Sequence, residues 1–555
     1  MASDKPEAER SSARLTHLAP SLGKTAYARW LGYARIDDQR RKESDSEPPS
    51  PSITHFATPR TWHRLLAAVL RFLTPSFIYS RWSRNPPASH KLTPTSWLDG
   101  LRGIACFIVF IYHYFYAYFE TRGHAFEFTG DKNHYFLQLP GLRIIHSGRS
   151  MVHIFFVISG FALSNRSVML IRKSMAPAER SHAILSNLAS SIWRRHLRLF
   201  LPCAGAYLLV AVVVAAGGFE VVPIGEKGWL KGNVEFRPTR EKGLWSQLVV
   251  AFCEYGKIAG PVALFRGWSW PDYISVYESH LWTIPEEFHQ SMLLFLIIAG
   301  LCHLKRWARV YVFLPAFVSV SLLNRRWATS LFMFGFFAAE VHAVVAAARE
   351  NSLQSKLPGG VYSSFRNPQP GRRRLEIVQK GAVAFTFAVA IYLCSIPDYQ
   401  PDSKSVTGFT TLAHSAPERY GGDDANGFWM SIGAELLVFS IIFLPAVQDV
   451  LCWRVFQYLG RISFALYLVH GTTNRSIGYA MVHWGWKVTG VGAMFVEGAK
   501  VDDLYVLETI RVAVVFVAFF ANLLVTIWLA DVFWRAFDLP SVRFVRWLEG
   551  KLVRS

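Results

Sequence analysis

An arginine and a histidine stand eleven residues apart in the apolar segment SWLDGLRGIACFIVFIYHYFYAY. If the segment is a helix, Arg102 and His113 share a face, because eleven residues correspond to about 1100° of rotation. An arginine at the centre of a membrane helix costs at least about 2.5–3.5 kcal/mol, so ionisable residues there are usually functional. The histidine could act as a general base or as a nucleophile. The simpler alternative is that Arg102 extends to the lipid headgroups while His113 bonds a neighbouring helix.

A pair of arginines in the segment SIWRRHLRLFLP is the second candidate site. Arg195 and Arg198 are three residues apart, so on a helix they project together and can hold an anionic phosphate group. Arginines also accumulate at cytoplasmic helix ends for topological reasons alone. Taken without other evidence, the pair fits that topological explanation better.

Two adjacent acids in HLWTIPEEFHQSMLLF supply the carboxylate. Thr283 and Glu286 have the spacing of a capping box, which predicts a structural role for Glu286. Glu287 then has no role in the helix cap, and we expect it near the non-cytoplasmic surface, on the same side as His113. A carboxylate close to an imidazole can orient it as a base. A further histidine, His470 in LGRISFALYLVHG, is expected near the depth of His113.

The composition places these residues in a membrane. Of 555 residues, 52% are hydrophobic and only 18% are charged, whereas soluble proteins carry about 25% charged residues. The apolar residues form long blocks, which makes a soluble enzyme improbable. The net charge of +20 lies mostly in short segments between these blocks, which indicates membrane orientation and not nucleic-acid binding. The six scattered cysteines show no metal-binding or disulfide spacing.

The predicted fold class is an all-α integral membrane protein, a bundle of about ten transmembrane helices. The expected spans are 97–119, 151–170, 198–217, 286–304, 309–323, 328–348, 380–396, 428–447, 460–482 and 510–534. Basic and less basic connecting segments alternate between them, which predicts that both termini are cytoplasmic.

The expected domains surround this bundle. Residues 1–60 form a disordered cytoplasmic tail, 61–96 an interfacial amphipathic segment, 97–535 the membrane domain and 536–555 a basic cytoplasmic tail.

The sequence resembles the acyltransferase-3 family of multi-pass membrane acyltransferases, particularly its fungal members. The matching stretches are WLDGLRGIACFIVFIYH, MVHIFFVISGFALS, RRHLR, HLWTIPEEF and GRISFALYLVH, in the family's order. The resemblance implies transfer of an acyl group, usually acetyl, from acyl-CoA to an acceptor hydroxyl, often on a sugar or lipid-linked glycan. From the residue spacing and the charge distribution we expect no metal and no nucleic-acid partner.

The family's functional residues fall on five positions. Its first-helix Arg and His fall on Arg102 and His113, its CoA-binding arginine pair on Arg195 and Arg198, and its acid on Glu287. The resemblance thus implies catalytic roles for His113, Glu287 and Arg102, and binding of acyl-CoA by the arginine pair.

Two questions stay open from the sequence. The alternative function is a multi-pass transporter of a small solute, in which the same buried charges line a path. No inverted repeat or pair of broken helices supports that alternative. The acceptor could be a carbohydrate, lipid-linked or secondary-metabolite hydroxyl, and segment 218–285 is the best candidate to contact it.

Overall fold

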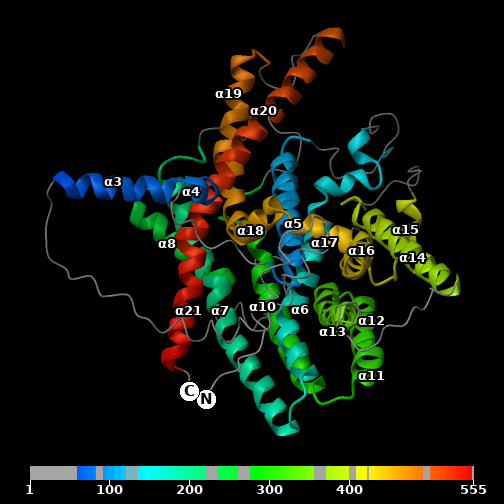
Figure 1. Ribbon diagram of the computed structural model, residues 1–555. Coiled ribbons are helices and arrows are strands. Elements are labelled where there is room, and N and C mark those ends of the chain that lie inside the picture. Colours follow the sequence, from blue (N-terminus) through cyan, green and yellow to red (C-terminus); the bar gives the residue numbers. More distant parts are fainter. Residues whose placement is uncertain are drawn as a thin grey trace, which may run out of the picture.

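The computed structural model describes residues 59–82, 92–119, 126, 135–220, 235–260, 275–354, 370–398, 408–421, 424–491 and 501–552 (Figure 1). All regular structure in these ranges is helical. The predicted tail 1–60 lies outside them except for its last two residues. The predicted interfacial segment contains two helices, α3 (Pro59–Leu73) and α4 (Ser76–Trp82).

Helices occupy all ten predicted span positions in the described ranges. They are α5 (Ser96–Tyr116), α6 (Gly148–Arg172), α7 (Pro177–Ala215), α10 (Thr283–Leu301), α11–α12 (Arg306–Leu323), α13 (Trp327–Gln354), α14 (Pro370–Cys394), α16 (Ala425–Phe443), α18 (Arg454–Thr473) and α20 (Val501–Phe533). Shorter helices include α8 (Leu244–Ala259), α15 (Phe409–Ser415), α17 (Pro445–Leu451), α19 (Tyr479–Val488) and α21 (Leu539–Leu552).

Eight helices among the described residues are long and apolar enough to cross a membrane. The described part of the chain is therefore all-helical and has the helices of an integral membrane protein, but the count of ten spans is not confirmed. The two predicted spans outside the eight are α10 and α18. Their polar residues explain the difference, because α10 carries Glu286 and Glu287, and α18 carries Arg461 and His470.

Glycines let α5 and α18 approach each other closely. A Cβ atom on Gly103 would lie 2.4 Å from the nitrogen of Gly460, and one on Gly460 would lie 2.1 Å from the carbonyl oxygen of Asp99. A side chain at either position would push the helices apart. The two helices run parallel, because Arg102 contacts Gly460 near their beginnings while His113 and His470 meet near their ends.

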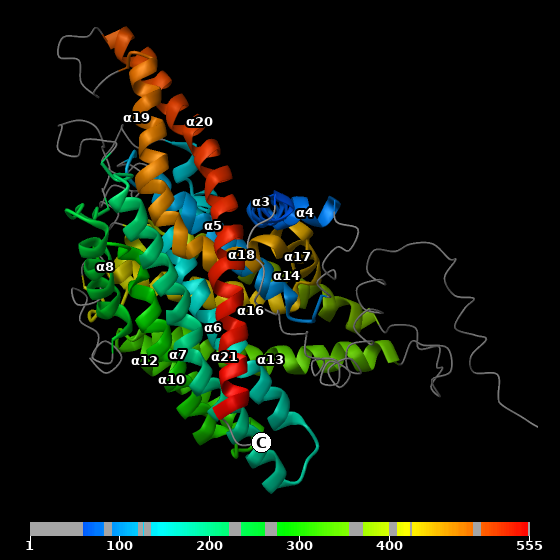
Figure 2. The ribbon, with the colours of Figure 1, turned by 90° about the vertical axis from the view of Figure 1, so that its left-hand side faces the viewer.

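The last helices form one long rod. A π-helical turn, η9 (Trp534–Asp538), joins α20 to α21 without a break, and both views show these helices in line (Figures 1 and 2). The rod also anchors the N-terminal helices. At the start of α4, the backbone N–H and hydroxyl of Ser76 both donate to the buried carboxylate of Asp531, at 3.0 and 2.5 Å.

Two connecting segments complete the arrangement around the end of α5. Residues 235–243 precede α8, which packs on α7. Residues 275–278 lead through the short helix η5 (Ser279–Trp282) into α10. Both segments contact the region where α18 continues into the π-helical turn η8 (Asn474–Gly478). Their position brings loop residues against the face of α5 that carries His113.

Candidate active site

The side chain of His113 is bonded to an acid from a distant loop. Its Nδ1 atom donates to the carboxylate of Glu235, and the two residues are 122 positions apart. Because a carboxylate can only accept here, Nδ1 carries a proton, and in the neutral form of the ring the Nε2 atom carries a lone pair. Although burial favours the neutral acid, the neighbouring His113 and Arg475 hold the pKa of Glu235 well below its usual value. This arrangement can support a base, because the carboxylate would balance the positive charge of a protonated imidazole.

A fully buried arginine holds this acid in place. The guanidinium of Arg475 lies 3.7 Å from Glu235 and 2.7 Å from Glu278. It also donates to the backbone carbonyls of Gly471 at 3.0 Å and of Phe236 and Tyr277 at 2.6 Å each. One side chain thus joins the end of α18 to both connecting segments. Without it, two buried carboxylates would lack a counter-charge.

Two more imidazoles lie beside His113. Its ring centroid is 5.0 Å from that of His470 and 5.8 Å from that of His280, and the latter two are 4.3 Å apart. The Nε2 atom of His280 donates to the carbonyl of Tyr467 at 2.8 Å. Burial, together with the nearby imidazoles, lowers the pKa of His280 well below its usual value, so this ring is neutral at pH 7.

The arginines predicted to bind a phosphate lie toward the other end of α5. Arg198 is exposed and lies within electrostatic range of Arg195, Arg102 and the carboxylate of Asp538. Arg102 donates to the carbonyl of Gly460 at 2.8 Å and lies 3.2 Å from Asp99. Within the described residues Arg198 forms no hydrogen bond or ion pair, so its charge is available to a ligand.

Glu287 pairs with the arginine cluster. Its carboxylate lies 2.7 Å from Arg195 and accepts a hydrogen bond of 2.8 Å from Ser159. Arg195 also donates to the hydroxyl of Ser291 at 2.9 Å. The sequence placed Glu287 and Arg195 near opposite membrane surfaces, and the structure does not show that separation. The acid bonded to His113 is Glu235.

The predicted capping box at the start of α10 is wrong. No side chain caps this helix, and the hydroxyl of Thr283 lies 2.6 Å from the hydroxyl of Tyr467. Glu286 accepts a hydrogen bond of 2.8 Å from Gln290, one turn further along. A contact with α18 therefore replaces the local cap that the spacing predicted.

The cluster around Arg102 and the cluster around His113 lie at different heights along the parallel helices α5 and α18. Arg102 and His113 are eleven residues apart on α5, which corresponds to about 16 Å along the axis. His470 follows Gly460 by ten residues on the parallel helix α18, at nearly the same interval. The site thus joins a cationic end to an imidazole and carboxylate end within one bundle.

The sequence did not reveal four members of the imidazole end, which are Glu235, Glu278, His280 and Arg475. Glu235 lies outside any periodic segment, and no spacing links it to His113. His280 lies inside the recognised stretch HLWTIPEEF, where a histidine opening an apolar helix was an available signal.

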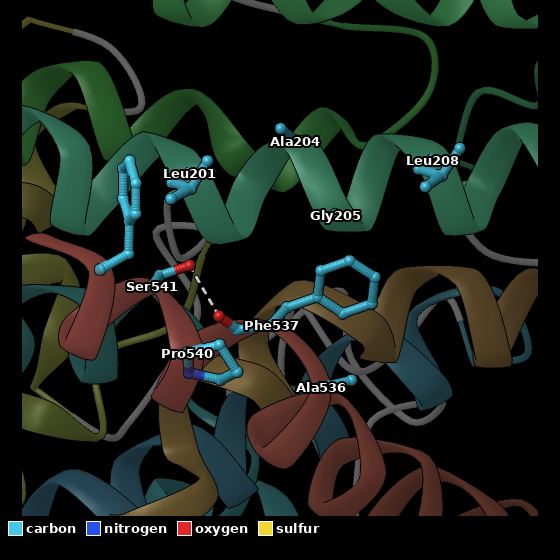
Figure 3. A pocket seen from close by; sticks show the side chains of 9 residues that line it. Leu201, Ala204, Gly205, Leu208, Ala536, Phe537, Pro540 and Ser541 are labelled. Atoms are coloured by element: carbon cyan, nitrogen blue, oxygen red, sulfur yellow. Dashed lines mark hydrogen bonds between the residues drawn. The ribbon is translucent and has the colours of Figure 1, made fainter. Parts of the chain in front are cut away.

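A cavity of ≈ 370 Å³ lies between α7 and the rod of η9 and α21 (Figure 3). Its lining is mostly apolar, and the hydroxyl of Ser541 is occupied by the carbonyl of Phe537 at 2.6 Å. It contains none of the candidate residues. Among the described residues, no group of His, Cys, Asp or Glu is arranged to hold a metal ion.

Comparison with known proteins identifies relatives that match 71–93% of the chain. The O-acetyltransferase PaAT-1 of Phomopsis amygdali is 29% identical over 528 residues, covering 93% of each chain. Acyltransferase R4 of a Phoma species is 26% identical over 73% of this chain and 87% of its own. Acyltransferase clz18 of Cochliobolus lunatus is 25% identical over 71% of this chain and 86% of its own.

No solved structure matches the chain significantly. The family model described as an acyltransferase domain matches residues 95–535, which include both polar clusters. The chain therefore belongs to the acyltransferase-3 family of membrane acyltransferases, as its motifs predicted, and it is an acyltransferase.

Proposed function

We propose that this protein transfers an acyl group, usually acetyl in such enzymes, from acyl-CoA to a hydroxyl of an acceptor molecule. The observation that carries the proposal is the bond between His113 and Glu235 at one end of α5, with the arginine cluster about 16 Å away at the other. The phosphates of acyl-CoA bind Arg195 and Arg198, and the extended pantetheine arm spans the interval to His113.

The reaction follows from the proton positions on His113. The acceptor hydroxyl donates its proton to Nε2 while its oxygen forms a bond to the thioester carbonyl carbon. Glu235 holds the opposite nitrogen and stabilises the imidazolium that forms. The tetrahedral intermediate then breaks its C–S bond, and the imidazolium returns the proton to the CoA sulfur. The products are the ester and free CoA.

The remaining site residues position the donor. Glu287 and Ser291 fix the guanidinium of Arg195, so Glu287 acts on the donor through that arginine. Arg102 adds positive charge near Arg198. This assignment keeps Glu287 and Arg102 in the site, but it gives the role of orienting the base to Glu235.

The acceptor is proposed to be a carbohydrate, lipid-linked or secondary-metabolite hydroxyl. The name of PaAT-1 supports oxygen as the acylated atom and acetyl as the group. We further propose that the arginine cluster faces the cytoplasm, where acyl-CoA is available, and that both termini lie on that side. The alternating basic segments support this orientation.

The test uses the full-length protein in nanodiscs with ¹³C-acetyl-CoA and fractionated fungal metabolite extract. Mass spectrometry identifies any labelled product, and the His113→Ala protein serves as the control. Labelled ester formed only by the wild type supports the proposal. If no fraction is labelled while proteoliposomes accumulate a solute from the extract, the transporter alternative replaces it.

A further inference from the structure

A buried nitrogen beside the proposed base has no partner. Nε2 of His470 forms no hydrogen bond within the described part of the chain, although only 1% of the residue is exposed. An unpaired polar atom at such a position carries a free-energy cost, and native proteins usually satisfy it. The inference below rests on the proposed acyl transfer and concerns what this atom binds.

The partners of the other ring nitrogen determine whether Nε2 of His470 needs a hydrogen-bond donor or an acceptor. Nδ1 of His470 lies 2.8 Å from the carbonyl of Tyr467 and 3.2 Å from that of Leu466. Carbonyl oxygens only accept, so the proton lies on Nδ1 and Nε2 presents a lone pair. The free position therefore requires an O–H or N–H donor.

His470 is suited to accept a hydrogen bond and not a proton. His113 has the carboxylate of Glu235 to stabilise a positive charge. Among the described residues no carboxylate is bonded to His470, and a buried cation without a counter-charge is strongly disfavoured. The lone pair of His113 is thus suited to take the proton of a reacting hydroxyl. The lone pair of His470 is suited to accept a hydrogen bond from a hydroxyl that stays intact.

Two ring nitrogens beside His113 are buried without a hydrogen-bond partner in the described residues, Nδ1 of His280 and Nε2 of His470. In His280 the Nε2 atom donates to the carbonyl of Tyr467, and the unpaired Nδ1 atom faces the carboxylate of Glu278 at 3.4 Å. By contrast, no carboxylate is bonded to His470 among the described residues. The rings of His113 and His470 are 5.0 Å apart between centroids. Hydroxyls on neighbouring carbons of a single molecule can reach both rings at this separation.

We propose that His470 is a specificity-determining residue that accepts a hydrogen bond from a second hydroxyl of the acceptor, next to the one that His113 deprotonates. The acceptor is then a diol or polyol. A water molecule can occupy the same position when no acceptor is bound, because it supplies an equivalent O–H donor.

The test compares 1,2-dodecanediol with 1-dodecanol, using acetyl-CoA and the full-length protein in nanodiscs. The wild type should show a kcat/KM about 10- to 100-fold higher for the diol, since the single alcohol leaves a buried acceptor unpaired. His470→Phe keeps a planar ring without the lone pair and should lose this preference through a slower diol reaction. His470→Gln, whose side-chain oxygen can replace Nε2, should restore part of it.

His342→Phe is the matched control. His342 is a buried histidine on α13 whose ring packs against Trp97 and Phe161, away from the cluster. This variant should keep the preference of the wild type for the diol. Melting in detergent solution shows whether each variant is folded.

A second measurement uses the labelled product formed from the metabolite extract. NMR should show a free hydroxyl on a carbon close to the new ester. An ester on an isolated hydroxyl, or equal wild-type rates with both alcohols, would overturn the inference while leaving acyl transfer intact. An effect of His470→Phe confined to the KM for acetyl-CoA would also overturn it and assign the nitrogen to a pantetheine amide. Absence of any labelled ester would instead be a failure of the proposed function.

Discussion

Arg195 on α7 and Glu287 on α10 form an ion pair 2.7 Å long, in which 10% of the arginine side chain and 23% of the glutamate side chain are exposed. Each of these residues was expected in the site for a separate reason. In the proposed mechanism this contact fixes the guanidinium of Arg195 in position to bind acyl-CoA.

The first prediction is that Arg195→Ala and Glu287→Gln are not additive. Each variant should raise the KM for acyl-CoA, because each disturbs the same guanidinium. The double variant should be little worse than Arg195→Ala, with a coupling of about 0.5–3 kcal/mol. Steady-state kinetics of the wild type, the two single variants and the double variant measure this double-mutant cycle. Independent effects of the two changes would show that Glu287 acts elsewhere.

The second prediction concerns Arg198, which has no partner among the described residues and is thus free to bind phosphate. Arg198→Ala should raise the KM for acyl-CoA at least about tenfold more than that for the acceptor, because a charge-assisted hydrogen bond contributes about 1.5–3 kcal/mol. The matched control is Arg194→Ala on the same helix, since Arg194 is engaged 3.4 Å from Glu549. If both variants have the same KM for acyl-CoA, only a topological role would be left for Arg198.

The third prediction is a pH effect of Glu235→Gln. In the wild type Glu235 stays ionised through the neutral range, because its pKa lies well below the usual value. The glutamine removes the counter-charge of the imidazolium, so turnover should fall by about 10²-fold or more and the acid limb of kcat/KM should move to lower pH. Glu241→Gln, six residues later along the same segment, should leave the profile unchanged. A normal profile for Glu235→Gln would exclude an orienting role.

The fourth prediction concerns topology. Ser174 and Ser415 are both exposed and lie in connecting segments of opposite charge balance. Replaced by cysteine in a Cys253→Ser background, which removes the exposed native thiol, Ser174 should react only from the cytoplasmic side and Ser415 only from the opposite side. Labelling of both from one side would contradict the proposed orientation.

Local patterns predicted the helices and the cationic end of the site. Apolar block length predicted ten spans, and a helix occupies each position in the described residues, although only eight helices there are long and apolar enough to cross a membrane. Helical periodicity put Arg102 and His113 on one face. The arginine spacing likewise anticipated that Arg198 and Arg195 lie together. These features depend on residues close in sequence, where helix geometry alone fixes the relation.

The imidazole end depends on contacts between distant segments. Glu235 and His113 are 122 residues apart, and Arg475 and Glu278 are 197 apart. No periodicity encodes such pairs, because helix packing and loop positions determine them. Thr283 illustrates the same limit, since its hydroxyl bonds Tyr467 and not the local backbone. Tertiary contacts there outweigh the local cap that the residue spacing predicted.

The central claim is that His113 is the base for acyl transfer. The direct measurement is turnover of ¹³C-acetyl-CoA into labelled ester by His113→Ala, in a sample shown by melting to be folded and by titration to bind acyl-CoA. The account predicts a loss of about 10²–10⁴-fold in kcat with little change in donor binding, because only the proton transfer is removed. Near-wild-type ester formation by the folded variant would contradict the account.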